Sequence, residues 1–281
     1  MAVRADPVSE VEYVRITFLG TGTSHGVPMI DCMLNGYARC EHETCRKALS
    51  DPRYRRSRAS ILVEQGGFNL LIDTSQDFRE QMLANQVMRV DAVLFTHAHA
   101  DHIYGLPDIR SYSAQQKTAI DLYGSADTLV ALREAFHYIF EPPAFVGGGI
   151  PSIAAHELAA PSVVGPLEVA PIHVVHGPLN GCQGYRLGPR PGGVAYIPDV
   201  KVIPESSLDA LQGLDVLILN CLRPRPHSSH LSLVEAVAYA ERIAPARCLF
   251  THMTHDIDPA VHGPQLPPWA SFAYDGLTVE A

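Results

Sequence analysis

Short runs of apolar residues recur along the chain and predict strands at first, then strands mixed with helices. The first strand is expected over 14–20, and a hairpin is expected where Gly66 and Gly67 separate the apolar runs 60–65 and 68–74. Further strands are expected at 91–97, 167–175, 184–188, 194–199, 214–221 and 246–252. With helices on the outer faces of the sheets, this order predicts an α/β fold (α+β by some schemes).

Three segments repeat their apolar residues at helical spacing. In the segment 75–86, Phe78, Met82 and Leu83 fall on one face, and Ser75 is expected to cap the helix N-terminus. Two further helices are expected over 127–140 and 231–243. By contrast, the Pro/Gly-rich segment 142–152 indicates either a mobile flap or a plain surface loop.

Composition supports one globular domain over 1–281, since 47% of the residues are apolar and only 18% are charged. The net charge of −9 and the lack of a long basic stretch argue against a long nucleic acid as partner. No segment resembles a signal peptide or reaches the ~18 apolar residues of a membrane span. The sequence therefore predicts a cytoplasmic protein without a membrane partner, in which Cys182 and Cys221 are buried thiols.

The segment FTHAHADHIYG places His97, His99, Asp101 and His102 within six positions, directly behind an apolar strand. Just past a strand end the chain can turn both alternate imidazoles inward, and each buried polar group would otherwise need its own partner. The four side chains offer two imidazoles to one cation and a carboxylate with an imidazole to a second. Nitrogen and carboxylate ligands suit Zn, Mn or Fe.

Four residues cannot fill two coordination spheres, so further ligands are expected at other strand ends. His176, Asp199 and His252 each follow an apolar run, as His97 does. Asp199 is the natural bridge, because a carboxylate can give one oxygen to each metal. His173 competes with His176, but it lies inside its strand and is expected to be a core or face residue.

These residues resemble the HxHxDH hallmark of the metallo-β-lactamase superfamily and its downstream ligands. The resemblance implies a four-layer αββα sandwich with a dinuclear site at one edge. It also implies that Asp73 orients a metal-binding histidine. It assigns His97, His99 and His176 to one metal, Asp101, His102 and His252 to the other, and Asp199 to both.

Three stretches are similar to the PhnP-like phosphodiesterases, which hydrolyse cyclic ribose phosphates: LGTGTSHGVP (19–28), the segment 40–60, and FTHMTHD (250–256). Members of that family carry a CxCxxC cluster that joins a late histidine around a structural zinc. A set of thiolates and imidazoles satisfies tetrahedral zinc, and unliganded thiols in a polar loop are the alternative. The resemblance places this zinc on an inserted loop at 32–58, with the ligands Cys40, His42, Cys45 and His255 and with Cys32 as a competing ligand.

His230, in HSSHLSL, matches the PhnP-like position that contacts the scissile phosphate. An imidazole there could protonate the leaving alkoxide or neutralise the phosphate, whereas a surface histidine at a helix start is the alternative. His227 is the weaker candidate for this role.

The sequence thus predicts a metal-dependent hydrolase with two divalent ions (Zn or Mn), an additional structural zinc, and Asp73, Asp101 and His230 as catalytic residues. The expected reaction is attack of a metal-bridging hydroxide on a small, often cyclic, phosphodiester such as a ribosyl cyclic phosphate or a cyclic nucleotide. The rivals are a 3′ RNA-processing nuclease of the RNase Z type, a glyoxalase-II-like thioesterase, a β-lactamase, and a non-catalytic metal- or nucleotide-binding protein. The resemblance also favours a homodimer.

Overall fold

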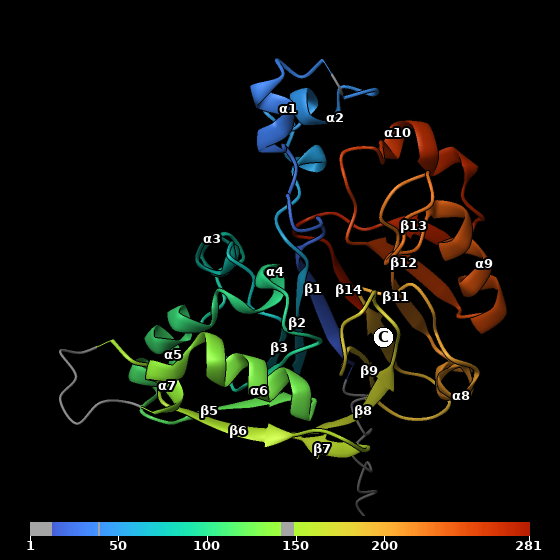
Figure 1. Cartoon of the computed structure of the whole chain (residues 1–281). Coiled ribbons are helices and arrows are strands. Elements are labelled where there is room, and N and C mark those ends of the chain that lie inside the picture. The colour runs from blue at the N-terminus through green and yellow to red at the C-terminus, as the bar shows by residue number, and fades with distance from the viewer. Residues whose placement is uncertain (1–12, 39, 142–148) are drawn as a thin grey trace, which may run out of the picture.

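The computed structural model describes residues 13–38, 40–141 and 149–281 (Figure 1). Its strands form two seven-stranded sheets, in the orders β14-β1-β2-β3-β4-β5-β6 and β13-β12-β11-β10-β9-β8-β7. The first sheet contains β1 (Arg15–Gly20), β2 (Ser60–Gln65), β3 (Phe68–Ile72), β4 (Ala92–Leu94), β5 (Ile120–Gly124), β6 (Ile153–Glu157) and β14 (Thr278–Glu280). The second contains β7 (Ser162–Val164), β8 (Leu167–His173), β9 (Gln183–Leu187), β10 (Val194–Ile197), β11 (Val216–Asn220), β12 (Arg247–Thr251) and β13 (Ala270–Phe272).

Helices flank both sheets, and they lie in several of the connections between strands (Figure 1). The α-helices are α1 (Ile30–Leu34), α2 (Thr44–Lys47), α3 (Phe78–Ala84), α4 (Ala100–Ile103), α5 (Arg110–Gln116), α6 (Ala126–Ala135), α7 (His137–Phe140), α8 (Glu205–Leu208), α9 (Leu233–Ile243) and α10 (Pro259–His262). Single 3-10 turns lie at Pro52–Tyr54, Leu106–Ile109, Asp209–Leu211 and Gly263–Gln265. No helix in the described part of the chain has the length and hydropathy needed to cross a membrane.

Three apolar cores separate four layers. The central core lies between the sheets and joins side chains such as Phe18 of β1 to Tyr196 of β10. A second core packs the second sheet against α9 through Ala236 and Ala240, and a third packs the first sheet against α3 and α6. Burying both faces of each sheet in this way confirms the predicted αββα sandwich.

Strand direction brings the functional strand ends together. In the first sheet, β3 runs parallel to β4, and in the second, β10 runs parallel to β11 and β11 to β12. Because parallel strands end at the same edge of a sheet, the residues that follow β3 and β4, and those that follow β10 and β12, emerge as neighbours.

Two helices in the structure differ in their bounds from those predicted. The first begins at Phe78, and Ser75 does not cap it, because the Ser75 hydroxyl accepts the N–H of Asp77 and donates to Gln81 Oε1. The second is divided into α6 and α7 at Phe136, which leaves helical geometry with φ −125° and ψ 41°. The proposed flap at 142–152 lies outside the described residues over 142–148.

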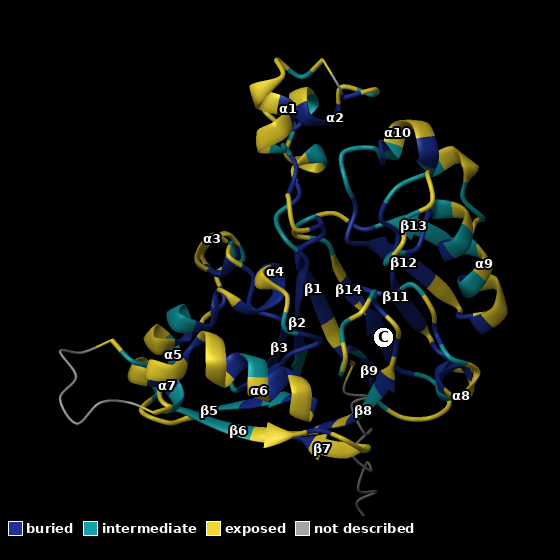
Figure 2. Ribbon diagram, in the orientation of Figure 1, coloured by how far each residue is buried: buried dark blue, intermediate teal, exposed yellow. Residues whose placement is uncertain are grey.

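The segment that contains α1 and α2 projects away from the sandwich, and Figure 2 shows that much of its surface is exposed. Its apolar cluster is small, and buried Arg56 supplements it by donating hydrogen bonds to the carbonyls of Thr254 (2.7 Å) and Ile257 (2.8 Å). Lys47 of α2 adds an ion pair with the buried carboxylate of Asp258, at 2.6 Å. These polar contacts fasten the segment to the loop that follows β12.

Candidate active site

The side chains predicted as active-site metal ligands converge at the ends of the two sheets. Each residue offers one ligand atom, and within each of four groups these atoms lie within 4.8 Å of one another. The groups are His97–His99–His176, His97–His102–Asp199, Asp101–His102–His252 and His176–Asp199–His230. All of these residues are buried except His230, which is half-buried, and His99, which is exposed. The competitor His173 is exposed on β8 and belongs to none of the groups.

The local backbone delivers these side chains from strand ends. The chain leaves β4 after Leu94 and enters the short helix α4, which carries Asp101 and His102. Asp199 comes two residues after β10, and His252 directly follows β12. His252 adopts a left-handed φ of 59°, a conformation that is costly for a residue with a Cβ and is typical of functional sites.

Asp73 organises one side of the centre. It is fully buried and accepts hydrogen bonds from the N–H and the hydroxyl of Thr96, each at 2.8 Å, and from Nδ1 of His102, also at 2.8 Å. The Thr96 hydroxyl gives its proton to Asp73, so it accepts from Nδ1 of His97 at 3.0 Å. Both imidazoles are therefore oriented with Nε2 toward the centre.

His176 is held in the same manner, because its Nδ1 donates to the carbonyl of Ser229 at 2.8 Å. Sequence reasoning identified Asp73 but missed Thr96 and Ser229. A threonine beside the first histidine of the cluster was a usable signal, whereas a backbone acceptor at position 229 leaves no trace in the sequence.

Several atoms of the centre have no hydrogen-bond partner among the described residues. They are Nε2 of His102, Oδ2 of Asp199, Nδ1 of His230 and both ring nitrogens of His252. In addition, Nε2 of His97 faces Nδ1 of His99 at 2.9 Å. Buried polar atoms without partners are costly, and converging imidazole and carboxylate atoms form a donor set suited to divalent cations. The residues present therefore fit metal binding.

Burial and the neighbouring carboxylates together determine the pKa values of the histidines in the centre. Burial lowers the pKa of His97 well below its ordinary value, and it lowers the pKa of His230 to about 3. Burial also opposes a charge on His102, but the carboxylates of Asp101, Asp199 and Asp73 outweigh it and raise that pKa. His97 and His230 are therefore neutral near pH 7, and neutral imidazole is the form that binds a metal.

His230 lies in the centre rather than on the surface. Its ring stacks on that of His252 with centroids 5.0 Å apart, and it meets His176 edge-on at 4.6 Å. Its Nδ1 is 3.6 Å from Oδ1 of Asp199. His227 lies one step further out, with its ring centroid 5.2 Å from that of His230.

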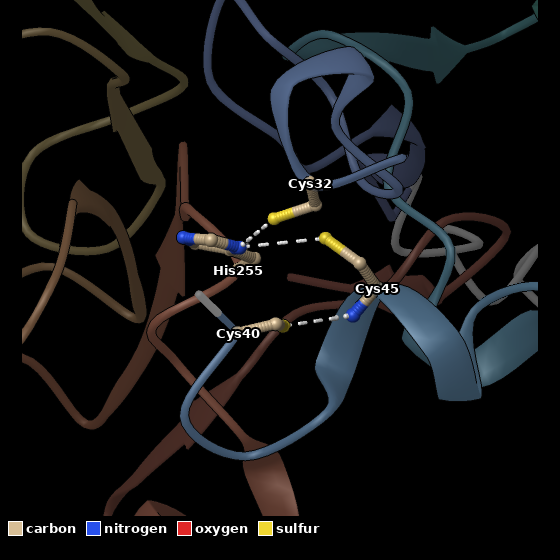
Figure 3. Close-up of side chains that lie close together, drawn as sticks. All are labelled: Cys32, Cys40, Cys45 and His255. Carbon is tan, nitrogen blue, oxygen red and sulfur yellow. Dashed lines mark hydrogen bonds between the residues drawn. The ribbon is translucent and has the colours of Figure 1, made fainter. Parts of the chain in front are cut away.

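A second cluster, made of three cysteines and one histidine, lies outside the active-site centre, where the projecting segment meets the loop after β12 (Figure 3). Nδ1 of His255 is 2.9 Å from Sγ of Cys32 and 3.4 Å from Sγ of Cys45, and Sγ of Cys40 accepts the N–H of Cys45 at 3.3 Å. All four ligand atoms lie within 4.8 Å of one another. Three thiols and one imidazole form a donor set suited to tetrahedral zinc.

The placement of His42 in this cluster is wrong. Its ring instead meets His262 edge-on, with centroids 5.2 Å apart, and the competing residue Cys32 takes the fourth position. The CxHxxC spacing suggested His42, but α1 folds back over the loop and brings Cys32 to the cluster from eight positions before Cys40.

Comparisons with known proteins agree with this geometry. The family described as "Beta-lactamase superfamily domain" matches residues 68–253, and the chain therefore belongs to that superfamily. Within it, a solved structure described as a new diphosphatase from the PhnP family superposes with a TM-score of 0.83 and 35% identity, covering 95% of this chain and 98% of that one. The predicted likeness to PhnP is thus confirmed.

Two curated relatives also match. The octanoyltransferase of Porphyromonas gingivalis is 32% identical over 268 residues, which cover 94% of this chain and 51% of that protein. A ribonuclease Z of Bradyrhizobium is 32% identical over 84 residues, 28% of each chain. The chain thus spans about half the length of the first relative and matches less of the second. Taken together, the superfamily, the PhnP-family diphosphatase and the ribonuclease Z support the prediction of a metal-dependent hydrolase at the level of the family.

Proposed function

We propose that the chain is a dinuclear metal-dependent phosphodiesterase acting on small, including cyclic, phosphodiesters. The main support is the position of Asp199 between two sets of ligands. Its Oδ1 lies 3.7 Å from Nε2 of His176 and 3.3 Å from Nε2 of His252, while its Oδ2 lies 3.2 Å from Nε2 of His102. One carboxylate can therefore serve both sets.

One metal would be held by His97, His99, His176 and Asp199, and the other by Asp101, His102, His252 and Asp199. Two divalent ions, Zn or Mn, would lower the pKa of water toward neutrality and withdraw charge from a phosphate. The protein contributes orientation, because Asp73, Thr96 and Ser229 fix the imidazoles before any ion binds.

His230 acts on the substrate in this proposal. Because burial keeps its imidazole neutral near pH 7, a ring N–H can donate a hydrogen bond to the phosphate or to the leaving oxygen. As the leaving oxygen gains charge, the same N–H is positioned to stabilise it through this hydrogen bond. Hydrolysis then joins a water oxygen to phosphorus, breaks one ester P–O bond and passes a proton of that water to the leaving alcohol.

The cluster of Cys32, Cys40, Cys45 and His255 is proposed to hold a structural zinc. Burial raises the pKa of the Cys45 thiol, so a cation is needed to stabilise its thiolate form. A zinc ion there would join the projecting segment to the loop after His252, where the apolar cluster is small.

RNA 3′ processing is the second candidate, because a ribonuclease Z is among the relatives. The net charge of −9 disfavours a long polyanionic substrate. We therefore favour a small molecule as the partner.

The test is a substrate panel on protein whose metal content has been measured: cyclic and linear phosphodiesters, a thioester and a precursor tRNA. We expect turnover of the small phosphodiesters only, and loss of that turnover in His99→Ala, which removes a ligand with little burial. Selective cleavage of the thioester or the tRNA, or undiminished phosphodiester turnover in the variant, would refute the proposal.

A further inference from the structure

The second sheet forms part of a cavity of about 380 Å³ that shares no residue with the proposed active-site centre or with the zinc cluster. Its lining comes from β7, β8 and β9, from the turn after β9, and from the 3-10 turn at Asp209–Leu211. Most of the wall is apolar and consists of Pro161, Val163, Val169, Ala170, Pro171 and Ala210. The volume lies at the lower end of ordinary ligand sites, which combine an apolar wall with a few polar groups.

Arg186 of β9 contributes a guanidinium to the wall of this cavity. Its neighbours Tyr185 and Leu187 belong to the central core, so Arg186 projects from the opposite, outer face of the sheet, where it is only 2% exposed. Its two Nη atoms donate to backbone carbonyls, those of Pro189, Gly192, Ala210 and Gln212. By contrast, Nε has no hydrogen-bond partner among the described residues. A buried donor without a partner is costly, and an acceptor in the cavity would satisfy it.

The carboxylates of the cavity do not balance its positive charge. Arg186 forms no ion pair with any described carboxylate, and neither does Arg190, the second arginine of the lining, which donates to the carbonyl of Asp209 at 2.7 Å. Burial lowers the pKa of the Arg186 guanidinium, and the like charge of Arg190 lowers it further, although Asp215 opposes this. Glu168 is the one carboxylate among the described residues of the lining, and it is exposed and paired with neither arginine. Two guanidinium groups and one carboxylate leave an excess of one positive charge.

We propose that this cavity binds a small molecule with an apolar body and a single carboxylate, which accepts the Nε–H of Arg186 and lies beside Arg190. A monoanion matches the excess charge of the lining. A doubly charged phosphate would have to leave water for a mostly apolar wall, which costs more free energy than the transfer of one charge. Because none of the candidate catalytic residues lines the cavity, the bound molecule is a ligand rather than a substrate, and the inference does not depend on the proposed hydrolysis.

Hexanoate is the probe, because it combines one carboxylate with a short apolar chain. In the comparison compounds, 1-hexanol keeps the chain without the charge, and acetate keeps the charge without the chain. Each compound is titrated into the isotope-labelled, zinc-loaded full chain, and the amide signals of Ala170 and Gly188 are followed by NMR. Hexanoate is expected to shift these signals with a Kd about tenfold or more below that of 1-hexanol or acetate, since each of these lacks one of the two interactions.

Four variants assign the binding to the cavity. Arg186→Gln should raise the Kd of hexanoate to that of 1-hexanol, and Arg190→Gln should raise it by about threefold. Ala170→Phe should abolish binding by filling the cavity, because Ala170 is the cross-strand partner of Arg186. Arg247→Gln is the matched control and should leave the Kd unchanged, since Arg247 is an exposed arginine of the same sheet outside the cavity. If Arg186→Gln does not fold, judged by its thermal midpoint, Arg190→Gln takes its place as the test of charge.

Three results would overturn the proposal. The first is the absence of hexanoate-dependent shifts at Ala170 and Gly188, including the case in which hexanoate shifts only the signals of the proposed active-site ligands. The second is an equal Kd for hexanoate and 1-hexanol, because the site would then not recognise a carboxylate. The third is undiminished binding in Ala170→Phe, or an unchanged Kd in both arginine variants of the cavity, because the bound molecule would then lie elsewhere.

Discussion

The carboxylate of Asp73 and Nδ1 of His102 lie 2.8 Å apart, and both side chains are completely buried. This pair fixes which nitrogen of His102 faces the centre, although Asp73 itself belongs to none of the described groups of candidate ligands. Asp73→Asn should therefore lower the affinity for active-site metal by about 10- to 100-fold, since an amide is a weaker acceptor than a carboxylate. Metal titration followed by calorimetry measures this, and an unchanged affinity would contradict the role given to Asp73.

His230→Ala should lower kcat by about 100-fold or more while metal content stays constant, because the variant loses the hydrogen-bond donor to the leaving oxygen and keeps the proposed metal ligands. His227→Ala is the matched control, with a smaller effect expected from its more distant ring. Since His230 also lies within 4.8 Å of ligand atoms on His176 and Asp199, loss of metal in the His230 variant would show that it is a ligand instead.

Cys45→Ala should release one zinc per chain and lower the thermal midpoint, because the proposed zinc site links the projecting segment to the loop after β12. His42→Ala tests the sequence-based alternative and should retain the zinc, as the His42 ring faces His262 rather than the thiols. Equal zinc content in wild type and Cys45→Ala would contradict the proposal that this cluster binds a structural zinc.

Asp258→Asn should lower the free energy of unfolding by about 1 kcal/mol at pH 7, a modest value because Lys47 is 39% exposed. Burial alone would raise the pKa of Asp258, but the hydrogen bonds from Lys47 and from the N–H of Ala260 outweigh it and lower that pKa below its ordinary value. Because this pKa is lower in the folded than in the unfolded protein, the ionised carboxylate stabilises the fold above pH ~4. This contribution is lost as the pH falls through the folded-state pKa.

Urea unfolding in a chelator, at pH 7 and at about pH 3, measures this difference. The gap between wild type and Asp258→Asn should narrow at the lower pH. Asp51→Asn provides the control, because its carboxylate pairs with exposed Arg53 and the substitution should have no measurable effect. A gap that is the same at both pH values would show that the ion pair is not its source.

The sequence was most informative about the histidine and aspartate residues that follow strands. His97, Asp199 and His252 each follow an apolar run, and parallel strands carry such residues to a common edge, so their convergence could be predicted. The short strands β7, β13 and β14 have three residues each, too few to show a period, and they were not expected.

Other features depend on contacts that no local pattern encodes. Ser75 has the chemistry of a helix cap, but its hydroxyl binds Asp77 and Gln81, and the helix starts three residues later. Cys32 reaches the thiol cluster only because α1 folds over the loop.

Arg56 holds the projecting segment by donating to two carbonyl oxygens of the loop after β12. Both acceptors belong to the main chain, so this attachment does not depend on which side chains occupy positions 254 and 257. Substitutions in the loop after β12, or insertions and deletions in the projecting segment, can therefore leave the hydrogen bonds of Arg56 intact. The same sandwich could in this way acquire different outer modules without redesign of its interior.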